Sequence, residues 1–379
     1  MTISIAEPVL ATYIFIAIFV VAILISLRKK KDEGFFPIST TNELKGLAVL
    51  TVLFGHIGYF LITGNLFLFP LSTISGVGVD LFLFLSGYGL VVSAMRKSRT
   101  IGSFYRDRLL KLMIPLWVIL ALFYLLDLFV LNKSYSINSI ISSFLGFFPT
   151  ASLYSDINSP LWYLTLILFY YLVFPLVFIK KKPWLSAVII YLISYSLLAL
   201  NFSSISGVRY FYETHYWAFP IGVFLGGLLY NTKTVDSLIA KIKTKIKAST
   251  LLVVFKNIVY YLLILSLLFA IGYASYSGMG RNIGQEQLIS IAVTLCFVVL
   301  FLMKKMEIRL FSLLGIYSYE IYLLHWPILY RYDIFFGIFP GWLAMILYVI
   351  LFICLGWGLK KVSELITGIF LREKSKNTK

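Results

Sequence analysis

Long apolar segments recur along almost the whole chain and are separated by short polar connections. A helix needs roughly 20 apolar residues to cross about 30 Å of hydrocarbon, and eleven such spans can be drawn along the pattern. We therefore predict an all-α polytopic membrane protein with eleven transmembrane helices. Their expected limits are 8–27, 44–62, 76–95, 112–131, 159–179, 184–201, 216–230, 251–272, 286–303, 310–329 and 341–359.

Composition excludes a water-soluble globular protein. Hydrophobic residues make up 60% of the 379 positions, and charged residues only 13%. The mean hydropathy of +0.93 is far above what a solvated surface carries. The apolar segments are therefore expected to face lipid and one another.

The basic residues fall on alternate connections. The chain has 33 Lys and Arg residues and a net charge of +17. If the N-terminus lies outside, all of these residues except Lys133, Arg209, Arg281 and Arg331 lie on the cytoplasmic side or at its membrane edge. This asymmetry follows the positive-inside rule and predicts an N-out, C-in orientation. The positive charge therefore needs no nucleic-acid partner.

Three parts can be distinguished along the chain. Residues 1–40 are expected to form an N-terminal transmembrane anchor and a basic cytoplasmic linker, because no Lys or Arg precedes the first span and the run "RKKK" follows it. Residues 41–362 are expected to form one membrane domain, and residues 363–379 a basic cytoplasmic tail. The lysine-rich connection at about 232–250 is expected to lie in the membrane interface.

Ionisable side chains inside the spans are candidates for a functional site, because placing them in lipid is costly unless they find partners or water. These side chains are Lys45, His56, Asp80, Asp127, Glu320 and His325.

Two cysteines, Cys296 and Cys354, also fall inside spans. They lie far apart in sequence, so we expect neither a disulfide nor a metal site from them.

Lys45 and His56 share one face of the second predicted helix. They are eleven residues apart in "NELKGLAVLTVLFGH", which brings them to within about 20° on the helix surface and separates them by about 16 Å along the axis. Lys45 is then at the cytoplasmic edge and His56 lies past the midplane. A snorkelling lysine and a histidine bonded to a neighbouring helix explain the same pattern.

Two further stretches have both a structural and a functional interpretation. The third span contains Ser86, Gly87 and Gly89, small residues that allow helices to approach closely. It is followed by "RKSRTIGSFYRDRLLKLMIP", whose cations fit the positive-inside rule and also suit a ligand that carries phosphate groups.

The tenth span, "GIYSYEIYLLHWPIL", places Glu320 near the membrane centre and His325 near the outer edge. Five residues put them about 140° apart, so they are not expected to pair within one helix. A carboxyl group at that depth is expected to be protonated or paired across helices.

Two of these stretches resemble signatures of the acyltransferase 3 family of bacterial membrane acyltransferases. The first family signature is an Arg, ten residues and a His in a helix that begins at the cytoplasm. The segment "NELKGLAVLTVLFGH" matches it with Lys45 at the arginine position and His56 at the histidine. The segment "LFLFLSGY" is similar to the family's "FFxxSG" run through Ser86 and Gly87.

Two more signatures follow in the family's order. The segment "RLLKLMIP", with Arg108 and Lys111, resembles a basic Arg-x-x-Arg just before a proline. The segment "SYEIYLLHWPI" resembles an ending of the form "SYxIYLxHxP", with Tyr319, Tyr322 and His325. The resemblance covers most of the chain and makes the first span an addition before the usual ten-helix core.

The chain departs from the family pattern in two ways. Lysine replaces arginine at positions 45 and 111, which keeps the charge but loses the planar bidentate fork. Many relatives have a "WSLxxEEQFYL" helix, whereas "LWYLTLILFYYLVFP" aligns Trp162 and Tyr171 but has neither glutamate. A catalytic role for those glutamates therefore does not carry over.

The resemblance implies an O-acyltransferase of the bacterial cytoplasmic membrane. Such an enzyme moves an acyl group, most often acetyl, from cytosolic acyl-CoA to a hydroxyl of a cell-surface glycan or lipid-linked saccharide. Acyl-CoA is then the co-substrate, the saccharide and membrane lipid are the other partners, and no metal or nucleic acid is implied.

The same resemblance implies roles for individual residues. Arg108 and Lys111, with Lys45, are expected to hold the CoA phosphates through charge-assisted bonds. His56 is expected to receive the thioester and to act as general base on the acceptor hydroxyl, or to carry the acyl group transiently. The other candidates for the catalytic site are Lys45, again, with Glu43, Ser86, Tyr322 and His325.

Two other classes of function stay open. In a proton-coupled transporter or flippase, His56 and Glu320 would carry protons and the aromatic outer connections would contact a solute. Those aromatics also fit an interfacial belt. If the lysine replacements abolish CoA binding, the protein is instead a non-catalytic partner in polysaccharide assembly. Binding of acyl-CoA from the cytosolic side discriminates among these classes.

Overall fold

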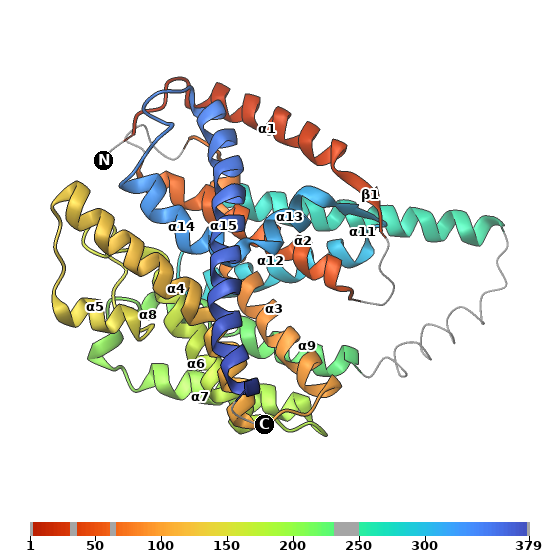
Figure 1. Ribbon diagram of the computed structural model, residues 1–379. Coiled ribbons are helices and arrows are strands. Elements are labelled where there is room, and N and C mark those ends of the chain that lie inside the picture. The colour runs from red at the N-terminus through yellow and green to blue at the C-terminus, as the bar shows by residue number, and fades with distance from the viewer. Residues whose placement is uncertain (1–2, 31–35, 61–65, 231–249, 377–379) are drawn as a thin grey trace.

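The computed structural model describes residues 3–30, 36–60, 66–230 and 250–376. This part is almost entirely helical, with one pair of short strands, β1 (Leu27–Lys29) and β2 (Met306–Ile308) (Figure 1). The helices are α1 (Pro8–Ile25), α2 (Ile38–Ile57), α3 (Ser75–Arg96), α4 (Ile101–Leu131), α5 (Ile137–Phe144), α6 (Trp162–Val177), α7 (Pro183–Ala199), α8 (Arg209–His215), α9 (Ala218–Tyr230), α11 (Thr250–Ser277), α12 (Ile283–Met303), α13 (Arg309–Ile316), α14 (Ser318–Tyr330) and α15 (Gly341–Lys376).

Within the described residues, eight helices are long and apolar enough to cross a membrane: α1, α2, α3, α4, α6, α11, α12 and α15. Each overlaps one of the predicted spans. The prediction of an all-α polytopic membrane protein is thereby confirmed. The N-out, C-in orientation stays a prediction.

The three other predicted spans are occupied by shorter helices. α7 has 17 residues and α9 has 13. The prediction of one continuous helix over 310–329 is wrong, because the chain leaves helical geometry at Tyr317 (φ −110°, ψ 12°) and forms α13 and α14 instead. The interfacial segment predicted at 232–250 lies outside the described residues except for its last position.

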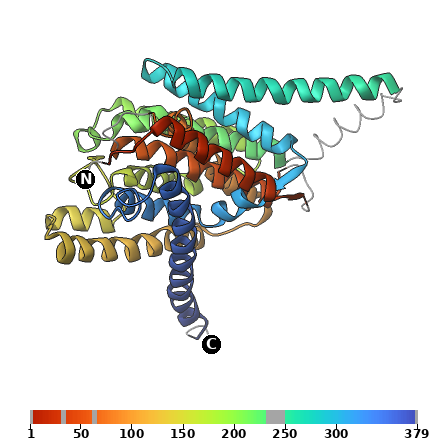
Figure 2. The ribbon, with the colours of Figure 1, turned by 90° about the horizontal axis from the view of Figure 1, so that it is seen from above.

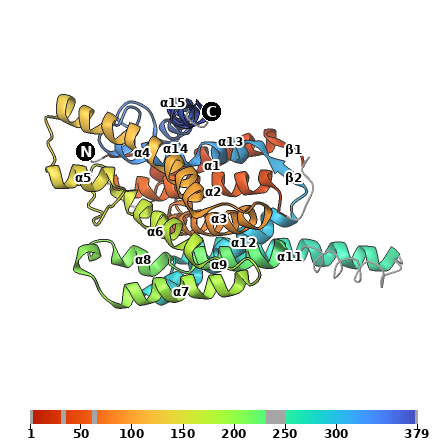
Figure 3. The same cartoon turned by 60° about the horizontal axis from the view of Figure 1, so that its bottom comes forward.

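The core is a series of helices packed side by side. In Figure 3, α13, α2, α3, α9 and α7 follow one another across the molecule, and each contacts the next. α14 and α15 pack together on the α13 side, while α11 lies against α12 on the other. Figure 2 shows α11 along one edge of the bundle and the C-terminal half of α15 projecting from the opposite edge.

Glycines bring α2 and α13 into backbone contact. A Cβ atom at Gly46 would collide with the backbone carbonyl of Phe311, and one at Gly315 would collide with the carbonyl of Asn42. Because the two glycines face the partner backbone from both sides of the contact, α13 lies directly against the first half of α2. Gly46 belongs to the "NELKGLA" stretch, so part of that signature is explained by packing.

α3 and α9 approach each other in the same way. A Cβ atom at Gly87 would meet the carbonyl of Phe219, and one at Gly222 would meet the carbonyl of Phe84. The expected close approach at Gly87 is therefore confirmed. Gly89 has no atom within 4 Å of its Cβ position, so its small size serves no helix contact there.

The basic run after α1 is fastened to the connection between α12 and α13. β1 pairs antiparallel with β2, with Arg28 opposite Glu307. The Arg28 guanidinium donates to both carboxylate oxygens of Glu307, at 3.0 and 2.7 Å, and the Ser312 hydroxyl donates at 2.8 Å. Arg28 above all holds the pKa of Glu307 below its ordinary value.

The α2–α13 contact predicts the effect of adding one methyl group. Gly46→Ala forces a Cβ atom against a backbone carbonyl that cannot rotate away, so we expect a loss of stability of about 1–3 kcal/mol, measured as a lower thermal unfolding midpoint in detergent. Gly89→Ala is the matched control, because its Cβ meets open space and alanine favours the helix by up to about 1 kcal/mol. Equal midpoints for Gly46→Ala and wild type would contradict the contact.

Candidate functional site

Two histidines from distant segments meet at the end of α2. His56 Nδ1 lies 2.7 Å from His325 Nε2 of α14, and the rings stack with centroids 5.0 Å apart. Trp326 packs edge-on against His56 at 5.2 Å. The sequence singled out both histidines separately, and the tertiary structure makes them a hydrogen-bonded pair.

The hydrogen-bond network determines which nitrogen carries each proton. His325 Nδ1 lies 2.7 Å from the backbone carbonyl oxygen of Tyr322. A carbonyl only accepts, so in the neutral pair His325 Nδ1 carries the proton and its Nε2 accepts. His56 Nδ1–H is then the donor between the rings. The remaining nitrogen of His56, Nε2, keeps a free lone pair.

His56 lines a cavity of about 250 Å³. Aromatic rings and short polar groups form most of its wall, and these come from the ends of several helices. Another wall residue is His215, so two of the three histidines in the chain border this cavity and the third supports one of them. The lining residues are His56, Tyr59, Ser75, Gly76, Val79, Ala151, Leu153, Ser159, Pro160, Trp162, Tyr210, Phe211, Thr214, His215, Glu286 and Trp326.

His215 was not among the residues singled out from the sequence. It ends α8, within the aromatic-rich connection "SSISGVRYFYETHYW", and its Nδ1 lies 2.8 Å from Asp80 Oδ1 of α3. The chain has only three histidines, and this rarity was the signal in the sequence that could have drawn attention to His215. Its distance in sequence from Asp80 concealed the pairing.

Neither Tyr322 nor Ser86 is among the residues that line this cavity. The Tyr322 hydroxyl donates to the carbonyl of Pro160, a residue of the cavity wall, and its ring meets that of Tyr163 at 5.5 Å. The Ser86 hydroxyl neighbours the phenol groups of both Tyr163 and Tyr171. Tyr163 therefore contacts both Tyr322 and Ser86.

The other end of α2 carries Glu43 and Lys45, away from the histidines. Glu43 is fully buried; it pairs with Lys304 and accepts from the backbone N–H of Ile308 at 2.6 Å. These contacts tie α2 to the end of α12 and to β2. The Glu43 carboxylate thus holds helices together and does not line the cavity.

Lys45 belongs to a cluster of cations at the same end. Its charged neighbours are Arg108 of α4 and Lys360 of α15, and Lys360 also bonds to the carbonyl of Ile316 at 3.1 Å. Lys111 lies about one turn beyond Arg108 on α4 and is exposed. Like charges gathered in this way favour an anionic ligand.

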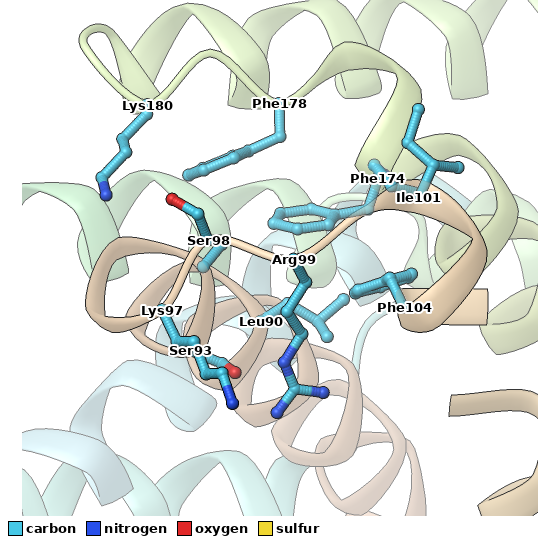
Figure 4. A pocket seen from close by; sticks show the side chains of 12 residues that line it. Leu90, Ser93, Lys97, Ser98, Arg99, Ile101, Phe104, Phe174, Phe178 and Lys180 are labelled. Carbon is cyan, nitrogen blue, oxygen red and sulfur yellow. The ribbon is translucent and has the colours of Figure 1, made fainter. Parts of the chain in front are cut away.

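A second pocket, of about 240 Å³, lies between the end of α3, the start of α4 and the end of α6 (Figure 4). Three phenylalanines form an aromatic wall, with Phe174 and Phe178 stacked at 4.9 Å and Phe104 against Phe174 at 6.0 Å. Basic side chains stand around this wall. The lining residues are Leu90, Ser93, Ala94, Lys97, Ser98, Arg99, Ile101, Phe104, Phe174, Pro175, Phe178 and Lys180.

The remaining intramembrane acids have other environments. Asp127 is fully buried and is held by Arg331 at 2.5 Å and by the Tyr332 hydroxyl at 2.6 Å. Glu320 is 8% exposed, with Lys360 among its charged neighbours. Over residues 3–30, 36–60, 66–230 and 250–376, no group of three or more His, Cys, Asp or Glu side chains is arranged to hold a metal ion.

The histidine pair predicts an asymmetric response to two substitutions at His325. His325→Leu removes the acceptor for His56 Nδ1–H and leaves a buried donor unpaired, which costs about 1–3 kcal/mol. His325→Gln can present its amide oxygen near the position of Nε2 and should recover part of that loss. Thermal unfolding in detergent measures both, and equal stabilities would argue against the assigned donor and acceptor.

Comparison with known proteins gives the family. The chain matches the family model described as an acyltransferase domain over residues 42–361, a range that includes most of α2 and all of α14. No curated protein and no solved structure matches it. Since the match extends over most of its length, the chain belongs to the acyltransferase 3 family and is a membrane acyltransferase.

Proposed function

We propose that the protein is an O-acyltransferase of the bacterial cytoplasmic membrane. It moves an acyl group, which we infer to be acetyl, from cytosolic acyl-CoA to a hydroxyl of a cell-surface or lipid-linked saccharide. The observation that carries this proposal is the free lone pair on His56 Nε2, kept unprotonated by His325 and Tyr322 in the wall of a cavity. An imidazole in that state can take a hydroxyl proton or attack a thioester.

The pocket in Figure 4 suits the nucleotide end of CoA. Phe178 offers an aromatic face for the adenine ring and is backed by the buried ring of Phe174. Lys97 and Lys180 stand around it as partners for phosphate oxygens. Arg99 is a third such cation, and it also bonds to Asp107 at 3.2 Å. Sequence reasoning placed the phosphates at other cations, Lys45, Arg108 and Lys111. We extend that site to include this pocket.

One helix runs along both sites. The nucleotide pocket is lined by Leu90 and Ser93 of α3, and the histidine cavity by Gly76 and Val79 of the same helix. Eleven residues between Val79 and Leu90 correspond to about 16 Å, a distance that the extended pantetheine arm of CoA can bridge. Ser86 lies between them and is suited to position that arm.

The cavity also suits a saccharide as acceptor. Aromatic faces stack on the apolar faces of sugar rings, and polar groups beside them orient the hydroxyls. Besides the two histidines, the polar members of the wall are Ser75, Ser159, Thr214 and Glu286, and the aromatic ones are Tyr59, Trp162, Tyr210, Phe211 and Trp326. An interfacial belt would not require these rings to surround one cavity.

The direct test is acyl transfer in proteoliposomes. Purified protein with radiolabelled acetyl-CoA and a cell-envelope glycan extract should release CoA and label the glycan. His56→Ala should lower transfer by roughly 100-fold or more while still showing a cooperative thermal unfolding transition, at a midpoint lowered by the loss of the bond to His325. If wild type neither binds nor consumes acetyl-CoA or other acyl donors, the transporter function is favoured instead.

A second prediction concerns the nucleotide pocket. Lys97→Ala and Lys180→Ala each remove a cation beside the aromatic wall, so we expect KM for acetyl-CoA to rise about tenfold, the loss of a contact of about 1.4 kcal/mol, with little change in kcat. Lys361→Ala is the matched control, since Lys361 is an exposed lysine of α15 with 60% of its side chain accessible. An unchanged KM in both pocket variants would indicate that the nucleotide binds at another cluster of cations.

A further inference from the structure

The histidine cavity contains a second imidazole with its own carboxylate. His215 Nδ1 lies 2.8 Å from Asp80 Oδ1, and the Ser290 hydroxyl donates to Asp80 Oδ2. His215 is 4% exposed and Asp80 is completely buried. Three elements, α3, α8 and α12, each supply one member of this cluster.

The contacts orient the His215 ring. Both Asp80 oxygens accept, so His215 Nδ1 carries a proton and donates it, and Nε2 is the nitrogen with the free lone pair. Trp162 stacks on the ring at 5.8 Å and 14°. A Cβ atom at Gly76 would lie 3.3 Å from Cε1 and 3.8 Å from Nε2, so the glycine leaves this edge of the ring uncovered. Gly76 and His215 both line the cavity.

Asp127 shows what a purely structural carboxylate looks like in this protein. Its partners are Arg331 and two tyrosines, Tyr135 and Tyr332, none of which exchanges protons readily near neutral pH. Asp80 is paired instead with an imidazole that borders a cavity. That pairing is the arrangement in which a carboxylate orients a base.

We propose that His215 is the general base for the acceptor hydroxyl and that His56 carries the acyl group. The inference rests on the proposed O-acyltransferase function. Once His56 Nε2 is acylated, its lone pair is used in the new bond and cannot take a proton. A second base bordering the same cavity is then needed, and His215 is such a base.

The two steps balance as follows. His56 Nε2 attacks the thioester carbon, the C–N bond forms, the C–S bond breaks and CoA leaves as a thiolate, while the His56 Nδ1 proton moves to His325 Nε2. The acceptor oxygen then attacks the acyl carbon, the C–O bond forms and the C–N bond breaks. Its proton passes to His215 Nε2, and His325 returns a proton to His56 Nδ1. Water carries the proton from His215 away and supplies one to the CoA thiolate.

The test separates the two halves of the reaction. His215→Asn keeps an N–H donor near the position of Nδ1 for Asp80 but has no basic nitrogen, so it preserves the buried hydrogen bond. Wild type, His215→Asn and His56→Ala are incubated with radiolabelled acetyl-CoA, first without and then with glycan acceptor. Label on the protein and label on the glycan are measured, and thermal unfolding midpoints report folding.

We expect His215→Asn to release CoA and to become labelled as wild type does, and then to transfer the label to glycan roughly 100- to 10,000-fold more slowly. Asp80→Asn, which cannot orient the same tautomer of His215, should also be labelled normally and should slow transfer to glycan by a smaller factor. Transfer by His215→Asn within a few-fold of wild type overturns the proposal and leaves the function of His56 intact. Loss of labelling together with transfer in a folded His215→Asn also overturns it, and failure of wild type to transfer overturns the proposed function itself.

Discussion

Backbone contact between α2 and α13 determines where the site can form. Gly46 and Gly315 allow the two helices to touch at their main chains, and the chain then bends at Tyr317. α14 therefore continues at a new angle and returns to the far end of α2. Without that approach and that bend, His325 would not reach His56. The hydrogen bond between the two histidines therefore depends on the helix contact at the two glycines.

Three fully buried carboxylates in the described part of the chain are paired with basic side chains of other segments, as expected where water is scarce. Glu43 is bound by Lys304, Asp127 by Arg331, and Asp80 by His215. Removing one partner of such a pair leaves an uncompensated buried charge, which costs several kcal/mol. The first two pairs join helices to connections, whereas the third lies against a cavity. The same physical requirement therefore supports scaffold and site alike.

The two ends of the bundle have different chemistry. Cations and stacked phenylalanines gather around the end of α3, and unprotonated imidazole nitrogens with aromatic rings gather around its start. Such a separation suits the proposed reaction, whose donor is a multiply charged nucleotide and whose acceptor is an uncharged hydroxyl compound. It also keeps the basic nitrogens away from the cations.

The sequence by itself determined the class of protein, since apolar length and basic asymmetry depend only on local composition. It also identified His56, His325 and the α2 signature, because spacing along one helix is a local property. Only the tertiary structure decided that the two histidines share a proton, that Glu43 belongs to the scaffold, that the tenth span is broken, and that His215 meets Asp80. These facts depend on contacts between segments as far as 269 residues apart, and the periodicity of a single helix carries no information about which neighbour its faces will meet.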